Sequence, residues 1–294
     1  MNSTTLSPGV RYMMASAFFF SIMGLAVKLV GQRLPTQEVV FVRSLLNAGF
    51  TYAMLRHARV PIWGNRPAVL ALRGTFGFLA LSCVFYAVVH LPLADATVLQ
   101  YTNPVFTAIF AAWLLGERME RGEAGLILAS LLGVVLIARP GFLFGGHAAR
   151  LDLFAVGVAL VGSMFSAAAY VTVRQLARTE HPLVIVFYFT LVSVIGSAPA
   201  TLADPVMPRG TEWVFLLLVG VAAQAGQVCL TRGLALEPAG RATAIGYLQV
   251  VFAAIWGALL FGEIPDGWVI AGATVIIGST LVLARQRVRA ARAA

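Results

Sequence analysis

Runs of about 20 apolar residues recur along this 294-residue chain, and they constrain its fold more than any other feature. A helix of that length crosses the roughly 30 Å hydrocarbon core of a membrane. Only 11% of the residues are charged, whereas soluble domains carry about 25%. The sequence therefore predicts an all-α integral membrane protein.

Ten transmembrane helices are expected, separated by turns that contain proline or glycine. Their predicted ranges are 11–31, 37–55, 67–90, 93–116, 121–138, 151–174, 183–203, 212–235, 239–261 and 266–284. The first apolar run is followed by Gly31 and Arg33 and lacks a small-residue cleavage site. We therefore expect it to be a membrane span and not a cleaved signal peptide.

The net charge of +9 results from 21 basic and 12 acidic residues. So hydrophobic a chain is not expected to bind nucleic acid, and its basic residues should lie in loops at the membrane edge. With ten spans, fourteen basic residues fall on the side of the termini and five on the other side. Since basic loops stay in the cytoplasm, both termini are expected there, in a bacterial inner membrane.

An internal repeat relates the two halves of the chain. Residues 92–117 and 238–263 align without gaps at an offset of 146, and twelve of the 26 positions are identical. The same offset relates Phe19 to Phe165 and Gly74 to Gly220. We therefore expect two five-helix repeats, residues 1–146 and 147–294.

The repeats should have opposite orientations in the membrane, because five is an odd number of crossings. The loop after Glu117 carries Arg118 and Arg121, whereas the equivalent loop after Glu263 carries Asp266 and no basic residue. Inverted repeats of this kind are typical of secondary transporters, whose two halves enclose a site near the middle of the bilayer.

The sequence resembles the EamA type of the drug/metabolite transporter superfamily. The resemblance rests on Phe41-Val42-Arg43, on Leu93-Ala94-Asp95-Ala96-Thr97, on Asn103-Pro104-Val105-Phe106 and on the Gly-Glu pairs that close the fourth and ninth spans. Leu72-Arg73-Gly74 and the run from Arg139 to Phe144 are similar to the branch of S-adenosylmethionine-uptake and related organic-anion carriers. The resemblance implies ten helices, small organic cargo, and a central cavity lined mainly by spans one, three, four, six, eight and nine.

Polar residues near the middle of the fourth and ninth spans are the first candidates for a binding site. Polar groups at membrane depth are costly and usually face a cavity or another helix. Gln100, Tyr101 and Asn103 lie in the fourth span, and the repeat pairs Tyr101 with Tyr247 and Asn103 with Gln249. We expect these residues to bind substrate, although hydrogen bonds between helices are an equally open alternative. Pro104 should kink the fourth span.

Further candidates lie in other spans. Gln224 and Gln227 share one face of the eighth span and could line the cavity or connect helices. Tyr86 and Trp256 are also candidate binding residues, although core packing is the commoner role for such aromatics, as it is for Tyr170.

Two arginines fall inside predicted spans. Arg43 needs a partner, either a substrate carboxylate or a protein group, and it joins the candidate binding residues. Arg73, nearer a helix end, is expected to extend its charged group to the cytoplasmic edge.

We expect a secondary transporter that moves a small organic metabolite by alternating access, through exchange or facilitated transport. A proton-coupled exporter of amino acids or drugs is the alternative, and a pore or a membrane enzyme is the alternative of another class. The sequence has one lysine, Lys28, and no phosphate loop ending in Gly-Lys. It has no cluster of catalytic residues. We expect no cofactor or metal, contact with membrane lipid, and a monomer or homodimer.

The predicted topology can be tested directly. A single cysteine at Arg292 should react with a membrane-impermeant maleimide only after the cells are opened, because the basic C-terminal tail is expected in the cytoplasm. Labelling of this cysteine in intact cells would contradict the prediction.

Overall fold

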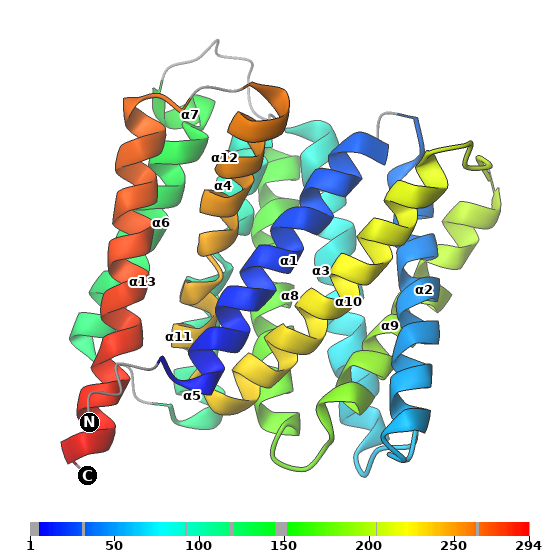
Figure 1. The fold of residues 1–294 in the computed structure, drawn as a ribbon, viewed down its shortest axis with the longest axis horizontal. Helices are drawn as coiled ribbons and strands as arrows, with labels where there is room; N and C mark the ends of the chain where they lie inside the picture. Colours follow the sequence, from blue (N-terminus) through cyan, green and yellow to red (C-terminus); the bar gives the residue numbers. More distant parts are fainter. Residues whose placement is uncertain are drawn as a thin grey trace.

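The computed structural model describes residues 6–30, 33–91, 93–117, 120–144, 152–203, 205–262 and 265–293, and in these residues all regular secondary structure is helical. The helices are α1 (Pro8–Val30), α2 (Thr36–His57), α3 (Pro67–His90), α4 (Leu93–Gln100), α5 (Asn103–Leu115), α6 (Arg121–Ala138), α7 (Gly141–Phe144), α8 (Leu153–Leu176), α9 (Pro182–Ala203), α10 (Glu212–Leu236), α11 (Ala239–Ile245), α12 (Leu248–Phe261) and α13 (Gly267–Ala293). They form one bundle (Figure 1). The expected all-α fold is confirmed.

The surface of the bundle is suited to lipid. Large apolar side chains point outward, including Trp113, which is 80% exposed, and Leu153, which is 82% exposed. In water such groups favour association, whereas in a bilayer they contact acyl chains. Seven described segments are long and apolar enough to span a membrane, with α4 and α5 taken together and α11 and α12 taken together. The protein is an integral membrane protein.

The number of crossings stays a prediction. The segments Gly122–Ala138 and Gly267–Leu283 are apolar but shorter than the seven. The less apolar α2 contains Arg43 and Asn47, both buried. Helix α1 begins and α13 ends at the same end of the bundle (Figure 1), as an even number of crossings requires.

The helix packing repeats with the 146-residue offset. Helix α1 packs along α10 and α3 packs along α8, while α2 packs along α9 and α6 along α13. The repeat makes α1 equivalent to α8 and α3 equivalent to α10, so the first two pairs are equivalent to each other. Each of the other two pairs joins a helix to its own equivalent. At finer scale, Gly74 lies against Val192, and their equivalents Gly220 and Leu46 also meet. The bundle therefore has approximate twofold symmetry.

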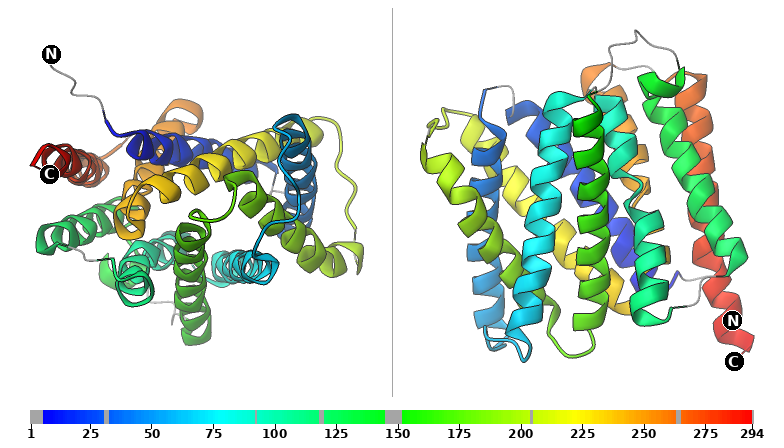
Figure 2. Two further views of the ribbon diagram at one scale, coloured as in Figure 1. Left: turned by 90° about the horizontal axis from the view of Figure 1, so that it is seen from below. Right: turned by 180° about the vertical axis from the view of Figure 1, so that it is seen from behind.

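The two repeats run in opposite directions, as predicted. Helix α1 starts at the end of the bundle where α13 finishes, whereas its equivalent α8 starts at the opposite end (Figures 1 and 2). The symmetry axis therefore lies in the membrane plane and not along its normal.

The fourth and ninth predicted spans are each broken into two helices. The sequence predicted only a kink at Pro104 in the fourth span. The break between α4 and α5 falls at Tyr101 and Thr102, before Pro104, which lacks a backbone donor. The equivalent break between α11 and α12 falls at Gly246 and Tyr247. Valine occupies position 250, the equivalent of Pro104, so proline alone does not cause the break.

Helices α6 and α13 cross closely through small residues. A Cβ atom on Gly133 would lie 2.8 Å from the backbone oxygen of Gly272 and 2.7 Å from the side chain of Ile276. Close approach of this kind is a common basis for helix association in membranes. The sequence contains Gly125, Ala129 and Gly133 at four-residue spacing, but a Cβ on Gly125 would meet no atom within 4 Å.

This difference generates a stability prediction. Gly133→Leu should separate α6 from α13 and destabilise the protein by about 1–3 kcal/mol, the usual cost of overpacking. The matched variant Gly125→Leu, on the same helix, should leave the melting temperature of the purified protein nearly unchanged. Equal melting temperatures for the two variants would show that the crossing does not depend on Gly133.

Candidate functional site

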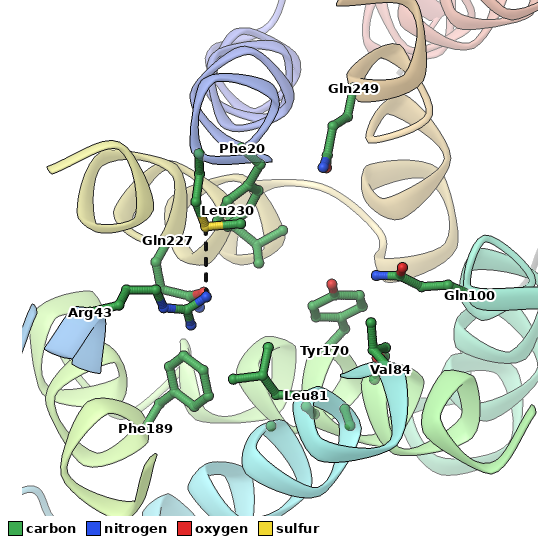
Figure 3. Close-up of a pocket in the computed structure, with 15 residues that line it drawn as sticks. Phe20, Arg43, Leu81, Val84, Gln100, Tyr170, Phe189, Gln227, Leu230 and Gln249 are labelled. Carbon is green, nitrogen blue, oxygen red and sulfur yellow. Dashed lines mark hydrogen bonds between the residues drawn. The ribbon is translucent and has the colours of Figure 1, made fainter. Parts of the chain in front are cut away.

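A cavity of about 170 Å³ lies inside the bundle and is lined by residues of both repeats (Figure 3). A second hollow of about 70 Å³ adjoins it. The two hollows share five residues, namely Phe20, Gln100, Tyr170, Leu230 and Gln249. We refer to both hollows together as the central cavity.

The helices around the central cavity include every span that the resemblance implied. Side chains come from α1, α3, α8 and α10 and from the broken pairs α4/α5 and α11/α12. Arg43 of α2 and Phe189 of α9 complete the lining. The second and seventh predicted spans thus also contribute.

Two glutamines from opposite repeats face the same space. Gln100 is the last residue of α4 and Gln249 lies in the first turn of α12, and both line both hollows. Figure 3 shows the two side-chain amides pointing into the cavity. Each amide offers a donor and an acceptor, so the residues beside the two breaks bring four hydrogen-bonding functions to the cavity.

Backbone groups freed at the first break are satisfied inside the protein. The Ser163 hydroxyl of α8 donates to the backbone oxygens of Leu99, at 2.7 Å, and of Gln100, at 3.2 Å. The Asn103 amide nitrogen donates to the Gln100 oxygen at 3.0 Å. These bonds replace helical hydrogen bonds that lipid could not replace in the hydrocarbon core, so the helix can be broken at this depth.

One hydrogen bond joins the two breaks across the symmetry axis. The Tyr247 hydroxyl donates to the backbone oxygen of Tyr101 at 3.0 Å, and the two tyrosines are equivalent positions 146 residues apart. Their ring centroids are 5.8 Å apart. Tyr101 lines the smaller hollow together with Asn103, whereas Tyr247 is fully buried. Tyr247 therefore connects the repeats at the level of the cavity.

Arg43 lies on the cavity wall with few partners. It is 9% exposed, its Nη1 donates only to the Met23 sulfur at 3.6 Å, and its Nε has no hydrogen-bond partner among the described residues. Gln227 lines the same wall, and its Nε2 also lacks a partner in the part of the chain that is described.

Besides Tyr247, three candidate residues lie outside the described cavity lining. The Gln224 amide nitrogen donates to the Thr51 hydroxyl at 2.8 Å and so connects α10 to α2. The Trp256 Nε1 donates to the Ser21 hydroxyl at 2.9 Å. Tyr86 stacks on His90 with ring centroids 3.9 Å apart. In this conformation all three contact protein groups.

The cavity also contains residues that sequence reasoning did not select. Tyr170 and Phe189 both line it, and both lie in spans where many aromatics occur. Repeat symmetry gave no signal for Tyr170, because the equivalent position 24 is glycine.

The expected position of Arg73 was wrong. It is 2% exposed, and its guanidinium carbon lies 4.3 Å from the centroid of the Phe189 ring. A guanidinium at this distance is attracted by the face of the ring. Arg73 therefore turns into the bundle and does not extend to its edge.

Ion pairs between the repeats lie at both ends of the bundle. At the end where α1 begins, Glu117 accepts hydrogen bonds from Arg174, at 2.8 Å, and from the backbone nitrogen of Ala239, at 2.9 Å. At the other end Arg139 pairs with Asp266 at 2.7 Å. The backbone donor of Val269 and the charge of Arg139 hold the pKa of Asp266 below its usual value.

No acid and no histidine is among the described residues of the central cavity. Across the described chain no three His, Cys, Asp or Glu side chains come together as metal ligands. The polar groups of the cavity are amides, hydroxyls and one guanidinium, which suit the recognition of a solute by hydrogen bonds and charge.

Comparison with known proteins gives consistent matches. The sequence pattern of the EamA-like transporter family matches residues 7–139 and again residues 153–285. The pseudopaline exporter CntI of Pseudomonas aeruginosa is 37% identical over 283 residues, which cover 96% of this chain and 98% of that protein. The S-adenosylmethionine uptake transporter of Rickettsia prowazekii is 24% identical, with 94% and 92% covered.

One solved crystal structure has the same fold. Its TM-score against this chain is 0.83 at 20% sequence identity, with 95% of this chain and 99% of that chain covered. The same arrangement of helices thus persists where few residues are shared.

The bond between the two breaks can be tested by removing one hydroxyl. Tyr247→Phe should destabilise the protein by about 1–2 kcal/mol, because the Tyr101 oxygen loses a buried hydrogen bond. Tyr188→Phe is the matched control, since the described residues offer no partner to the buried Tyr188 hydroxyl. Thermal unfolding of both purified variants should show a lower melting temperature for Tyr247→Phe alone. A lower melting temperature for Tyr188→Phe than for Tyr247→Phe would contradict the hydrogen bond assigned between Tyr247 and Tyr101.

Proposed function

Since the chain belongs to the EamA-like transporter family, we propose that it is a secondary transporter that moves a small organic metabolite across the bacterial inner membrane by alternating access. Membrane transport of a small solute follows from the family and its relatives. The mechanism, the membrane and the class of cargo belong to the proposal.

The observation that best supports the proposal is the pair of broken helices around one cavity. Gln100 and Gln249 come from opposite repeats and face the same space. In transporters with inverted repeats, discontinuous helices form the substrate site near the middle of the membrane. Tyr101 and Asn103 extend the proposed site into the smaller hollow.

Alternating access requires that each end of the cavity can open in turn. The Glu117–Arg174 pair and the Arg139–Asp266 pair connect the two repeats at opposite ends. The side chains of the second pair are each 43% exposed. A pair this exposed contributes about 0–1 kcal/mol, so its rupture costs little when the repeats move. The side chains of Arg174 and Glu117 are only 21% and 17% exposed, so this end should open at a greater cost. The bond from Tyr247 to Tyr101 at the centre can stay in place during this motion.

The relatives are named for opposite directions of transport, one for export and one for uptake. We therefore propose a cargo of the same size class, a small organic metabolite, and assign no direction from the fold. Exchange or facilitated transport fits the absence of acids from the described cavity lining.

The alternatives differ in measurable ways. A pore would give flux that does not saturate and no counter-exchange. An enzyme would convert its cargo, whereas the family and its relatives are transporters. We propose two repeats with boundaries at 1–146 and 147–294, in contact with lipid, that work as a monomer or homodimer without a cofactor.

The first transport prediction concerns the amides of the site. Replacing Asn103 and Gln249 together by leucine should reduce uptake into liposomes at least tenfold without loss of expression, because the cargo loses hydrogen bonds from both breaks. The cargo for this assay is first identified by a thermal-shift screen of metabolites. Gln175→Leu, at an exposed position of α8, is the control. Unchanged kinetics in the double variant would reject the site.

The second transport prediction concerns energy coupling. Acidifying the outside of liposomes at zero membrane potential should not drive accumulation above equilibrium, because an intramembrane proton relay needs a titratable group and the described cavity has no acid. Asp95 is the best exception, since it lies in α4 and its side chain is outside the described part. Accumulation that Asp95→Asn removes would contradict the prediction and identify Asp95 as the coupling residue.

A further inference from the structure

Arg43 and Arg73 are buried beside the central cavity, and no acid that the structure describes pairs with either. We propose that Arg43 and Arg73 form a subsite for cargo that carries two separate carboxylate groups. The inference rests on the proposed transport function and specifies the chemistry of its cargo.

Arg43 has unused hydrogen-bonding capacity directed at the cavity. Its single described hydrogen bond goes to the Met23 thioether at 3.6 Å, which is a weak acceptor. Its Nε has no partner among the described residues. Figure 3 shows the guanidinium between Gln227 and Phe189 on the cavity wall. A planar guanidinium in this position can bind a carboxylate through two parallel hydrogen bonds.

Arg73 places a second positive charge behind the same wall. Its guanidinium lies 4.3 Å from the centroid of Phe189, and the described chain offers no partner to its Nε or Nη1. The Nη1 atom would lie 3.1 Å from a Cβ atom on Gly77, and both Gly77 and Phe189 line the cavity. Stacking on the ring uses the face of the guanidinium and leaves its edge free to donate.

Six acidic side chains that the structure describes have partners other than these two arginines. Glu38 accepts from the backbone of Val206, Glu117 pairs with Arg174, Glu123 pairs with Arg241, Glu180 accepts from the backbone of Asn65 and Arg66, Glu212 pairs with Arg33, and Asp266 pairs with Arg139. None of the described ion pairs includes Arg43 or Arg73. Two buried charges without counter-charges are unfavourable, and an anionic cargo would supply the missing partners.

Each guanidinium can bind one carboxylate through two parallel hydrogen bonds, so a cargo with two carboxylates would give both arginines a counter-charge. The two guanidinium groups come from different helices, α2 and α3. Phe189 contacts the guanidinium of Arg73 and lines the same cavity as Arg43. A short carbon chain with an acid group at each end would contact the ring and reach both arginines. The amides of Gln227 and Gln100 can bind its other polar groups.

The test uses the full-length protein in nanodiscs and measures its melting temperature with defined probes. These are glutarate, its monoamide, its diamide and inorganic phosphate. Glutarate should raise the melting temperature in a saturable way, the monoamide should require at least tenfold higher concentration, and the diamide and phosphate should have no effect. A tenfold loss is a modest expectation for one charged hydrogen-bonding group.

Variants separate binding from a structural role of the arginines. Arg43→Gln and Arg73→Gln should each bind glutarate at least tenfold more weakly, and each should lose the preference for glutarate over the monoamide. Arg178→Gln, which removes an exposed charge outside the cavity, should keep that preference. If a glutamine variant does not fold, the lysine variant at the same position should fold and retain a reduced preference for glutarate, because it keeps the charge but loses the paired hydrogen bonds of the guanidinium.

Three results would overturn the subsite: equal stabilisation by glutarate and its diamide, stabilisation by phosphate alone, or a glutarate preference that survives both glutamine substitutions. Failure of the transport function gives a different result. Selective glutarate binding without any flux in liposomes would reject transport and retain the subsite. Flux of neutral solutes without an effect of glutarate would retain transport and reject the subsite.

Discussion

A helix can be interrupted inside a membrane only if the hydrogen bonds that it loses are replaced by protein groups or by water in a cavity, because lipid cannot replace them. Here the Ser163 hydroxyl binds the carbonyls at the end of α4, and the Tyr247 hydroxyl binds the carbonyl of Tyr101. The second of these bonds connects the two repeats where both helices break. In the proposed motion of the repeats this connection acts as the fixed centre of the bundle, and the cavity lined by Gln100 and Gln249 lies beside it.

Charge is distributed between the ends of the molecule and its centre. The described ion pairs that connect the two repeats, such as Glu117 with Arg174, lie near helix ends, and the exposed Arg139–Asp266 pair contributes only about 0–1 kcal/mol. Arg43 lines the central cavity and Arg73 lies against its wall residue Phe189, and both are buried without an ion pair among the described residues. In the proposed mechanism, the paired charges at the two ends are the contacts that change as the repeats move, and the two arginines beside the cavity are the groups that an anionic solute would bind.

Sequence patterns predicted much of the fold, because hydropathy and the 146-residue offset report on whole helices. They also selected Gln100, Asn103 and Gln249, since polar residues at the middle of a span are rare. The same reasoning missed Phe189, because which face of an aromatic-rich helix is turned inward depends on its neighbours. It misplaced Arg73, because distance from a helix end does not show that an aromatic ring lies within reach.

Alternating access around the fixed centre is the central claim, and distances between spin labels test it most directly. In a cysteine-free background, one label pair at Glu120 and Gln175 reports on one end and a pair at Pro35 and Arg209 reports on the other, all at exposed positions. We expect two distance populations for each pair. Any condition that increases the fraction of molecules with the longer distance at one end should decrease that fraction at the other end. A single unchanged distance at both ends, or simultaneous lengthening at both, would contradict the account.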